Sequence, residues 1–169
     1  MEKRVIVRWR QGLEFEAESR SGARVLLAGD TSEPAFRPAA LMLAALAGCT
    51  GMDAMSILVK KRQRIDRYEV AVTGQQREEH PRTFSAIVVE HVVEGRTLDD
   101  AAVARAIELS ARKYCVVGTT IASGDTTIEH RFRIRDEAGE RTCECLVIGP
   151  FGAGLASSEP ATEAVGATA

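Results

Sequence analysis

A run of 22 consecutive residues beginning at Pro38 contains a single charged side chain, that of Asp53. A helix of this length could cross a bilayer. An acidic residue at the centre of such a span is costly in lipid, however, and Gly48 and Gly51 interrupt the apolar run beside it. The flanking segments alternate as strands do. We therefore predict the buried central helix of a soluble domain, from about Pro38 to about Arg62, apolar nearly all round and buried on several sides.

The segments around this helix alternate between apolar and polar residues, which is the pattern of half-buried strands. A second, amphipathic helix is predicted after Thr97, which we expect to be its N-cap, and it should end near Tyr114. The order βββ-α-ββ-α-β indicates an α+β fold in which two central helices cover a mostly antiparallel sheet. The predicted strands comprise residues 3–9, 13–19, 23–28, 67–77, 82–94 and 126–135.

The size and charge of the chain fit one small domain. It has 169 residues and a formal net charge of −2, which gives no bulk attraction to nucleic acid or to an anionic membrane. We expect the domain to comprise residues 1–136. The extension that follows, residues 137–169, should be largely flexible, although residues 142–149 could form a short strand. The N-terminus has no apolar run of signal-peptide length, so a cytoplasmic location is predicted.

Four cysteines are too few for a disulfide scaffold, and in a reducing compartment they are expected to be thiols, redox groups or metal ligands. Cys49 lies in the middle of the predicted first helix between small residues, which would let a substrate or another backbone come close. Cys115 follows the predicted second helix, where it could serve as a resolving thiol. Core packing is the alternative for both cysteines. For Asp53, one turn after Cys49, the alternative is a satisfied hydrogen bond.

The remaining candidate ligands form no recognisable site. Cys143 and Cys145 are too closely spaced for a zinc site and have no second pair near them. His80, His91 and His130 are scattered and are expected to be solvated or hydrogen-bonded. The sequence also lacks a phosphate-binding loop, a dinucleotide-binding glycine pattern and a helix-turn-helix signal. We therefore predict no metal and no cofactor.

Three segments of the chain resemble the OsmC/Ohr family. RPAALMLAALAGCTGMDAMSILVKKRQ is similar to the central helix of that family, in which a cysteine follows an Ala- and Leu-rich run. VARAIELSARKYCVVGTTI is similar to its second cysteine region, and HPRTFSAIVVEHVVEG to the strand between them. The motifs GCTGMD and KYC fit an OsmC-like subgroup, and the resemblance covers about residues 1–136.

The resemblance implies an intertwined homodimer, with sites at the subunit interface, that reduces organic or hydrogen peroxides in oxidative stress defence. Cys49 would be the nucleophile that becomes a sulfenic acid, and Cys115 would condense with it to a disulfide. A dithiol reductant of the lipoyl or thioredoxin type would then restore both thiols. The implied partners are thus a second copy of the chain, a hydroperoxide and a dithiol.

The sequence departs from the family pattern at two places. The better-characterised peroxidases carry a glutamate near the start of the central helix, where this sequence has Ala39 and Ala40. They also use an arginine from the N-terminal strands, which has no counterpart in register. Arg37, Arg8 and Arg10 are the candidates to stabilise the thiolate instead, because a nearby cation lowers the pKa of a thiol.

Two other functions stay open. One is a non-catalytic dimer that binds a small apolar ligand at its interface, which the missing glutamate favours. The other is a redox-sensing protein, in which Cys49 and Cys115 would be oxidised reversibly without turnover. The peroxidase hypothesis is preferred because it explains both cysteines by one mechanism.

Overall fold

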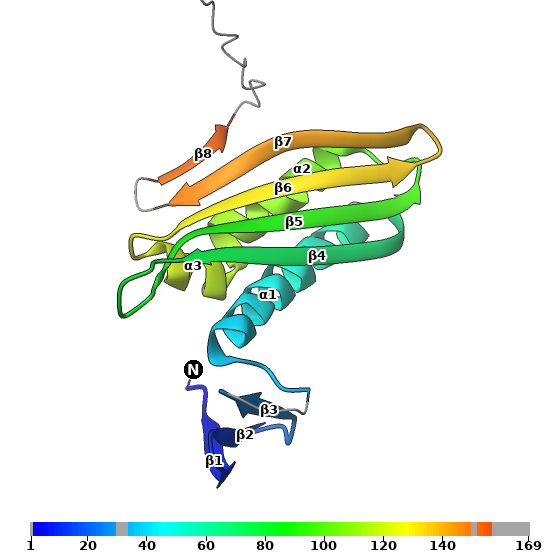
Figure 1. Cartoon of the computed structure of the whole chain (residues 1–169). Coiled ribbons are helices and arrows are strands. Elements are labelled where there is room, and N and C mark those ends of the chain that lie inside the picture. The colour runs from blue at the N-terminus through cyan, green and yellow to red at the C-terminus, as the bar shows by residue number, and fades with distance from the viewer. Residues whose placement is uncertain (1, 30–33, 150–151, 157–169) are drawn as a thin grey trace, which may run out of the picture. The chain divides into compact units, whose positions relative to one another are not determined.

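The protein forms two compact units, residues 1–45 and 46–169, with the boundary inside the first helix (Figure 1). The computed structural model describes residues 2–29, 34–149 and 152–156, and of these it describes no side chain in 143–148 or 152–156. The fold is α+β, as predicted, with antiparallel pairing at all but one strand junction.

The N-terminal unit contains the three strands that the alternation predicts. They form an antiparallel sheet in the order β1 (Val5–Gln11), β2 (Glu14–Ser19) and β3 (Arg24–Ala28). Gly12 and Gly22 lie in the two connecting turns with φ of +47° and +84°, a region that glycine enters without strain. Every residue of β1 is exposed.

The central helix, α1 (Pro38–Lys60), begins at the predicted proline. Its buried residues form one stripe with a spacing of four: Leu46, Thr50, Ala54 and Leu58. By length and composition α1 could cross a membrane, a test that the core helix of a soluble protein also passes. The sequence predicts burial of this helix on several sides, whereas among the described residues of α1 the fully buried side chains form a single stripe.

The second unit is built on a five-stranded sheet in the order β4-β5-β6-β7-β8. Strands β5 and β6 pair in parallel, which requires a crossover connection, and two helices and a π-helical turn supply it. These crossover elements lie on the same face of the sheet (Figure 1). The strands are β4 (Arg64–Gln76), β5 (Phe84–Arg96), β6 (Thr127–Asp136), β7 (Gly139–Gly149) and β8 (Gly152–Ala156), and the crossover elements are α2 (Asp100–Leu109), the π turn η1 (Ser110–Tyr114) and α3 (Val116–Ala122).

The core of this unit lies between the helices and the sheet. Leu58 of α1, Val103 and Ile107 of α2, and Val93 and Ile134 of the central strands are at most 1% exposed and belong to one apolar cluster. Burial of this cluster holds α2 against the sheet, where it contacts β6 and β7. The π turn η1, which follows α2, is thereby held beside the middle of α1, where Ser110 contacts Thr50.

The prediction that Thr97 caps the second helix was wrong. Thr97 has a left-handed φ of 50°, and the helix begins three residues later. Asp99 is the N-cap, with Oδ1 accepting from the backbone N–H of Ala101 at 3.0 Å and of Ala102 at 3.3 Å. Residues 98 and 99, between Thr97 and the first residue of the helix, complete the turn out of β5.

The C-terminal part of the sheet extends beyond the expected domain boundary. Strand β7 begins at Gly139 and pairs with β6, so the boundary expected at residue 136 does not coincide with an edge of the sheet. The short strand expected at 142–149 is part of this longer strand. Strand β8 and the short helix α3 were not predicted. A largely flexible extension was predicted for residues 137–169, but residues 139–149 and 152–156 of it form β7 and β8, and residues 150–151 and 157–169 lie outside the described residues.

Candidate functional site

The two thiols singled out from the sequence lie together with one carboxylate. Cys49 and Asp53 are one turn apart on the same face of α1, and Cys115 directly precedes α3. The two sulfur atoms and a carboxylate oxygen lie within 4.8 Å of one another. Cys49 and Asp53 are half-buried, Cys115 is 1% exposed, and both cysteines are free thiols. Thiols 66 positions apart in the sequence are thus neighbours in the fold.

A π-helical turn positions Cys115. The backbone N–H of Cys115 donates to the carbonyl oxygen of Ser110 at 2.9 Å, five residues earlier, which closes the turn η1. Cys115 then adopts an extended conformation and serves as the N-cap of α3, where its Sγ accepts from the Gly118 N–H at 3.3 Å. A π turn of this kind is frequent at functional sites. Here it directs one buried thiol at α1.

Ser110 connects the two segments that carry the thiols. Its hydroxyl lies 3.0 Å from the hydroxyl of Thr50, and both residues are fully buried. The Ser110 hydroxyl also lies within donating distance, 3.3 Å, of the Thr50 carbonyl oxygen and of Oδ2 of Asp53. These contacts fix α1 against the π turn at the level of the thiols. No local pattern points to Ser110, because its partners Thr50 and Asp53 are distant in the chain.

The charge around the thiols opposes ionisation of Cys115. The pKa of Cys115 is raised to about 12, and burial is the largest cause. Hydrogen bonding to Cys49, the charge of Cys49 and the charge of Asp53 contribute to this rise, and the hydrogen bond from the Gly118 N–H opposes it. Cys115 is therefore a neutral thiol at physiological pH.

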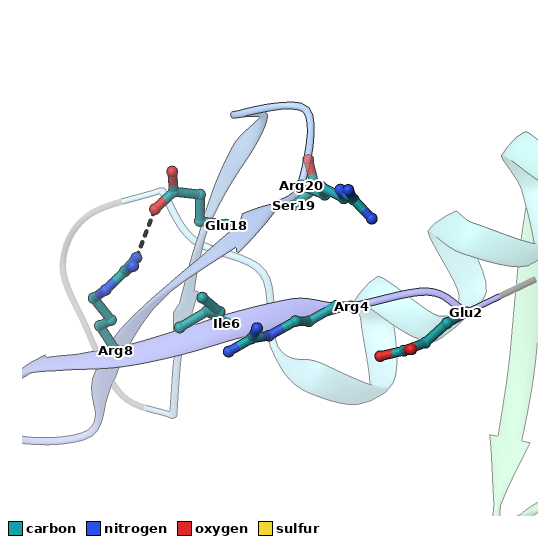
Figure 2. Close-up of a pocket in the computed structure, with 7 residues that line it drawn as sticks. All are labelled: Glu2, Arg4, Ile6, Arg8, Glu18, Ser19 and Arg20. Carbon is teal, nitrogen blue, oxygen red and sulfur yellow. Dashed lines mark hydrogen bonds and ion pairs between the residues drawn. The ribbon is translucent and has the colours of Figure 1, made fainter.

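The predicted cations belong to the other compact unit. Arg8 lies on β1 and binds Glu18 through an ion pair of 2.6 Å, which Figure 2 shows at the edge of a cavity of about 530 Å³. Arg10 and Arg37 are exposed, and neither makes an ion pair among the residues that the structure describes. The first turn of α1 contains no acidic residue, in agreement with Ala39 and Ala40.

A buried polar chain crosses the sheet of the second unit. The hydroxyl of Tyr68 on β4 lies 2.7 Å from Nδ1 of His91 on β5, and Nε2 of His91 lies 3.1 Å from Nδ1 of His130 on β6. The imidazoles are 0% and 2% exposed and stack at 5.4 Å between ring centroids. Burial lowers the pKa of His91 to about 3, with the charge of His130 adding to the effect, and burial alone lowers that of His130 to about 4. The expectation of hydrogen-bonded histidines holds for this pair.

The positions that the sequence predicts to form no site are His80, Cys143 and Cys145. His80 is exposed before β5, and the side chains of Cys143 and Cys145 lie outside the described ones. The sequence singles out Asp53 one turn after Cys49, with a satisfied hydrogen bond as the alternative to a functional role, and Ser110 supplies such a hydrogen bond at 3.3 Å. The spacing of four residues places the side chains of Cys49 and Asp53 on one face of the helix.

Comparisons with known proteins agree on one family. A family model described as OsmC-like protein matches residues 29–131. Protein YhfA of Escherichia coli (strain K12) is 42% identical over 128 residues, which are 76% of this chain and 95% of that protein.

Solved structures show the same fold at lower identity. An OsmC-like protein from Mycoplasma pneumoniae has a TM-score of 0.70 at 15% identity, covering 79% of this chain and 97% of that one. The organic hydroperoxide resistance protein OhrB of Bacillus subtilis has a TM-score of 0.54 at 19% identity, covering 78% and 98%. These two likenesses concern the fold alone.

Proposed function

Because the chain belongs to the OsmC-like protein family, we propose that it is a thiol-dependent peroxidase that reduces organic or hydrogen peroxides in oxidative stress defence. The observation that carries the proposal is the distance between Cys49 and Cys115, whose sulfur atoms lie within 4.8 Å. A disulfide has an S–S length of about 2.05 Å, so a modest movement joins them. The structural relative named for hydroperoxide resistance supports the choice of substrate class.

The exposure of the two thiols supports the roles that we propose for them. Cys49 is the half-buried thiol and Cys115 the buried one, so a peroxide reaches Cys49 first. The Cys49 thiolate attacks the O–O bond, an alcohol or water leaves, and Cys49 becomes a sulfenic acid. Cys115 then attacks the Cys49 sulfur and water leaves, giving a disulfide. A dithiol of the lipoyl or thioredoxin type reduces this disulfide by exchange, and its own thiols are oxidised.

The exposed apolar side chains support a homodimer. Val5, Val7 and Trp9 on β1 are 60%, 51% and 64% exposed, and Met52 and Val59 on α1 are 72% and 61% exposed. Soluble monomers rarely leave so much apolar surface uncovered. A second copy of the chain is the proposed partner, since α1 is apolar nearly all round and this chain buries one stripe of it. Sedimentation of the wild type should show a dimer that Met52→Lys weakens, and a monomeric wild type would contradict this.

The test of catalysis is consumption of cumene hydroperoxide with a lipoyl or thioredoxin-type dithiol. Wild type should turn over, Cys49→Ser should abolish turnover, and Cys115→Ser should leave a Cys49 sulfenic acid that mass spectrometry detects. A Cys143→Ser/Cys145→Ser double variant is the matched control and should retain activity. After one equivalent of peroxide, wild type should contain a disulfide between Cys49 and Cys115. Absence of turnover with both classes of dithiol refutes the proposal.

One cavity favours the ligand-binding alternative. Tyr114 and Val116, on either side of Cys115, are 50% and 69% exposed and help to line a cavity of about 460 Å³. A small apolar ligand in this cavity would protect the protein against thermal unfolding even in the Cys49→Ser variant. That result, together with no turnover by wild type, would favour a binding protein. A cytoplasmic location is proposed for either function, because reduced thiols persist there.

A further inference from the structure

The thiol pair and its neighbouring carboxylate have the ligand types and the spacing of a metal site. Around a tetrahedral zinc ion, sulfur and oxygen ligands at their usual bond lengths lie about 3.5–3.8 Å apart. The ligand atoms of Cys49, Asp53 and Cys115 already lie within 4.8 Å of one another without an ion. Rotation of the side chains by about 1 Å at the ligand atoms would close the remaining gap. Two ligands come from α1 and the third from the crossover.

The same group lacks positive charge. The only described side chain that hydrogen-bonds to Asp53 is Ser110, and no ion pair to Asp53 is found among the described residues. The sulfur of Cys115 meets a backbone N–H, a second sulfur and a carboxylate. The negative charge of this half-buried carboxylate, beside two thiols, is therefore not balanced by a described cation. A divalent cation would neutralise it and would favour deprotonation of both thiols.

Hydrogen bonds outside the group orient two of the three ligands. Ser110 donates to Oδ2 of Asp53 at 3.3 Å, which leaves Oδ1 available, and the Gly118 N–H donates to Sγ of Cys115 at 3.3 Å. Ser110 is itself held by Thr50. Such outer contacts accompany protein metal ligands because they fix the direction of each donor atom. The group is thus held in place from both segments of chain.

We propose that the reduced protein binds one divalent ion of the zinc class through Cys49 Sγ, Cys115 Sγ and an Asp53 carboxylate oxygen, with the fourth position open to water. Two thiolates select a borderline or soft ion over Mg²⁺ or Ca²⁺. Binding releases two thiol protons, and both thiolates then belong to the metal. A site with three protein ligands and one open position is the pattern of exchangeable rather than closed structural zinc.

The site would also link metal occupancy to oxidation, a consequence that rests on the proposed function. A hydroperoxide and two protons convert the two thiolates to a disulfide, an alcohol and water, and the metal loses both sulfur ligands and leaves. Conversely, bound metal occupies the electron pair with which Cys49 would attack a peroxide. Zinc should therefore inhibit peroxide consumption, and a chelator should restore it.

Metal binding is tested on the full-length, reduced Cys143→Ser/Cys145→Ser protein, in which Cys49 and Cys115 are the only cysteines. Titration with Co²⁺ should give a thiolate-to-cobalt charge-transfer band and the intense visible bands of tetrahedral cobalt, saturating at one ion per chain. Zn²⁺ should displace the cobalt and bleach both bands. Release of two protons per ion should accompany binding at pH 7.

Variants decide which residues hold the ion. Cys49→Ser should remove the charge-transfer band of a two-thiolate site. Asp53→Asn, which preserves the size of the side chain, should weaken binding about tenfold or more, because loss of even an outer contact to a metal ligand costs about 10–100-fold. The matched control is Asp66→Asn, an exposed acid on β4, which should bind cobalt like the parent. Circular dichroism checks that each variant is folded.

Three results would overturn the metal site: no cobalt bands at millimolar Co²⁺, equal affinity in Asp53→Asn, or unchanged bands in Cys49→Ser. These outcomes are independent of peroxide turnover. A protein that binds cobalt as expected and consumes no peroxide refutes the proposed function and leaves the metal site standing. A protein that consumes peroxide and shows no cobalt bands refutes the metal site alone.

Discussion

The buried pair His91 and His130 should make the stability of the protein fall steeply between pH 7 and pH 5. With both rings neutral, the Tyr68 hydroxyl can donate to His91 Nδ1, and His91 Nε2–H can donate to His130 Nδ1. A proton added to either ring places a charge in a site shielded from water, even where the hydrogen bonds reverse direction to accommodate it. The folded protein therefore resists protonation that the unfolded chain accepts.

The size of the effect follows from the pKa values. Both pKa values lie below the ordinary 6.5, at about 3 for His91 and about 4 for His130, so the unfolded state binds more protons as the pH falls below 6.5. Stability is then full above pH 6.5 and is lost on acidification. A pH of 5 lies about 1.5 units below the pKa of each ring in the unfolded chain. The free energy of unfolding is therefore lower by about 2 kcal/mol per ring, or about 4 kcal/mol for the pair. The result at pH 5 is insensitive to the folded pKa, provided that this lies below about 4.5.

Urea unfolding at pH 7 and at pH 5, at one protein concentration, measures this difference. Wild type should lose about 4 kcal/mol of unfolding free energy more than a His91→Gln/His130→Asn variant, and each single variant should lose an intermediate amount. His80→Gln, at an exposed position, should behave like wild type. If the double variant lost as much stability on acidification as wild type, the two histidines would not be neutral in the folded state and the reasoning would fail.

Four further substitutions test other parts of the structure by urea unfolding. Asp99→Ala should cost about 1 kcal/mol, as loss of an N-cap does, whereas Thr97→Gly should cost little or stabilise because Thr97 has a left-handed φ. Gly95→Ala should cost about 1–3 kcal/mol or more, because the new Cβ would lie 2.1 Å from a carbonyl oxygen of β4. Arg141→Met should reduce stability at pH 7 and flatten its loss toward pH 3, since Arg141 holds the pKa of the Asp136 carboxyl well below its usual range and that stabilisation is lost as the carboxyl protonates.

The elements with strong local signals were predictable. The alternation of residues 13–19 and the proline at position 38 are local patterns, and β2 and α1 are found close to where those patterns place them. The cap of α2 was placed two residues early because Thr97 and Asp99 both suit an N-cap, and the tight turn out of β5 decided between them. Helix α3 is only seven residues long, and its sequence VVGTTIA has no helical periodicity of its own.

The site was predictable only in part, because local patterns do not encode contacts between distant segments. Each thiol could be chosen from its setting along the chain, but their proximity depends on the parallel pairing of β5 with β6 and on the crossover between them. No local pattern encodes the contact of Ser110 with Thr50 or the chain of His91 and His130, because each joins residues from separate elements. The arginines were predicted from their charge and their position in the N-terminal segment, which do not reveal their partners, and Arg8 binds Glu18.

The π turn makes the number of residues between Ser110 and Cys115 as important as their identity. Deleting one residue there would allow an ordinary α turn and would rotate everything after it by about 100° around the helix axis. Cys115 would then point away from α1 while every side chain of the site was still present. The exposed residues 112–114 should therefore tolerate substitution but not insertion or deletion, because the number of residues between Ser110 and Cys115 sets the direction of the Cys115 sulfur.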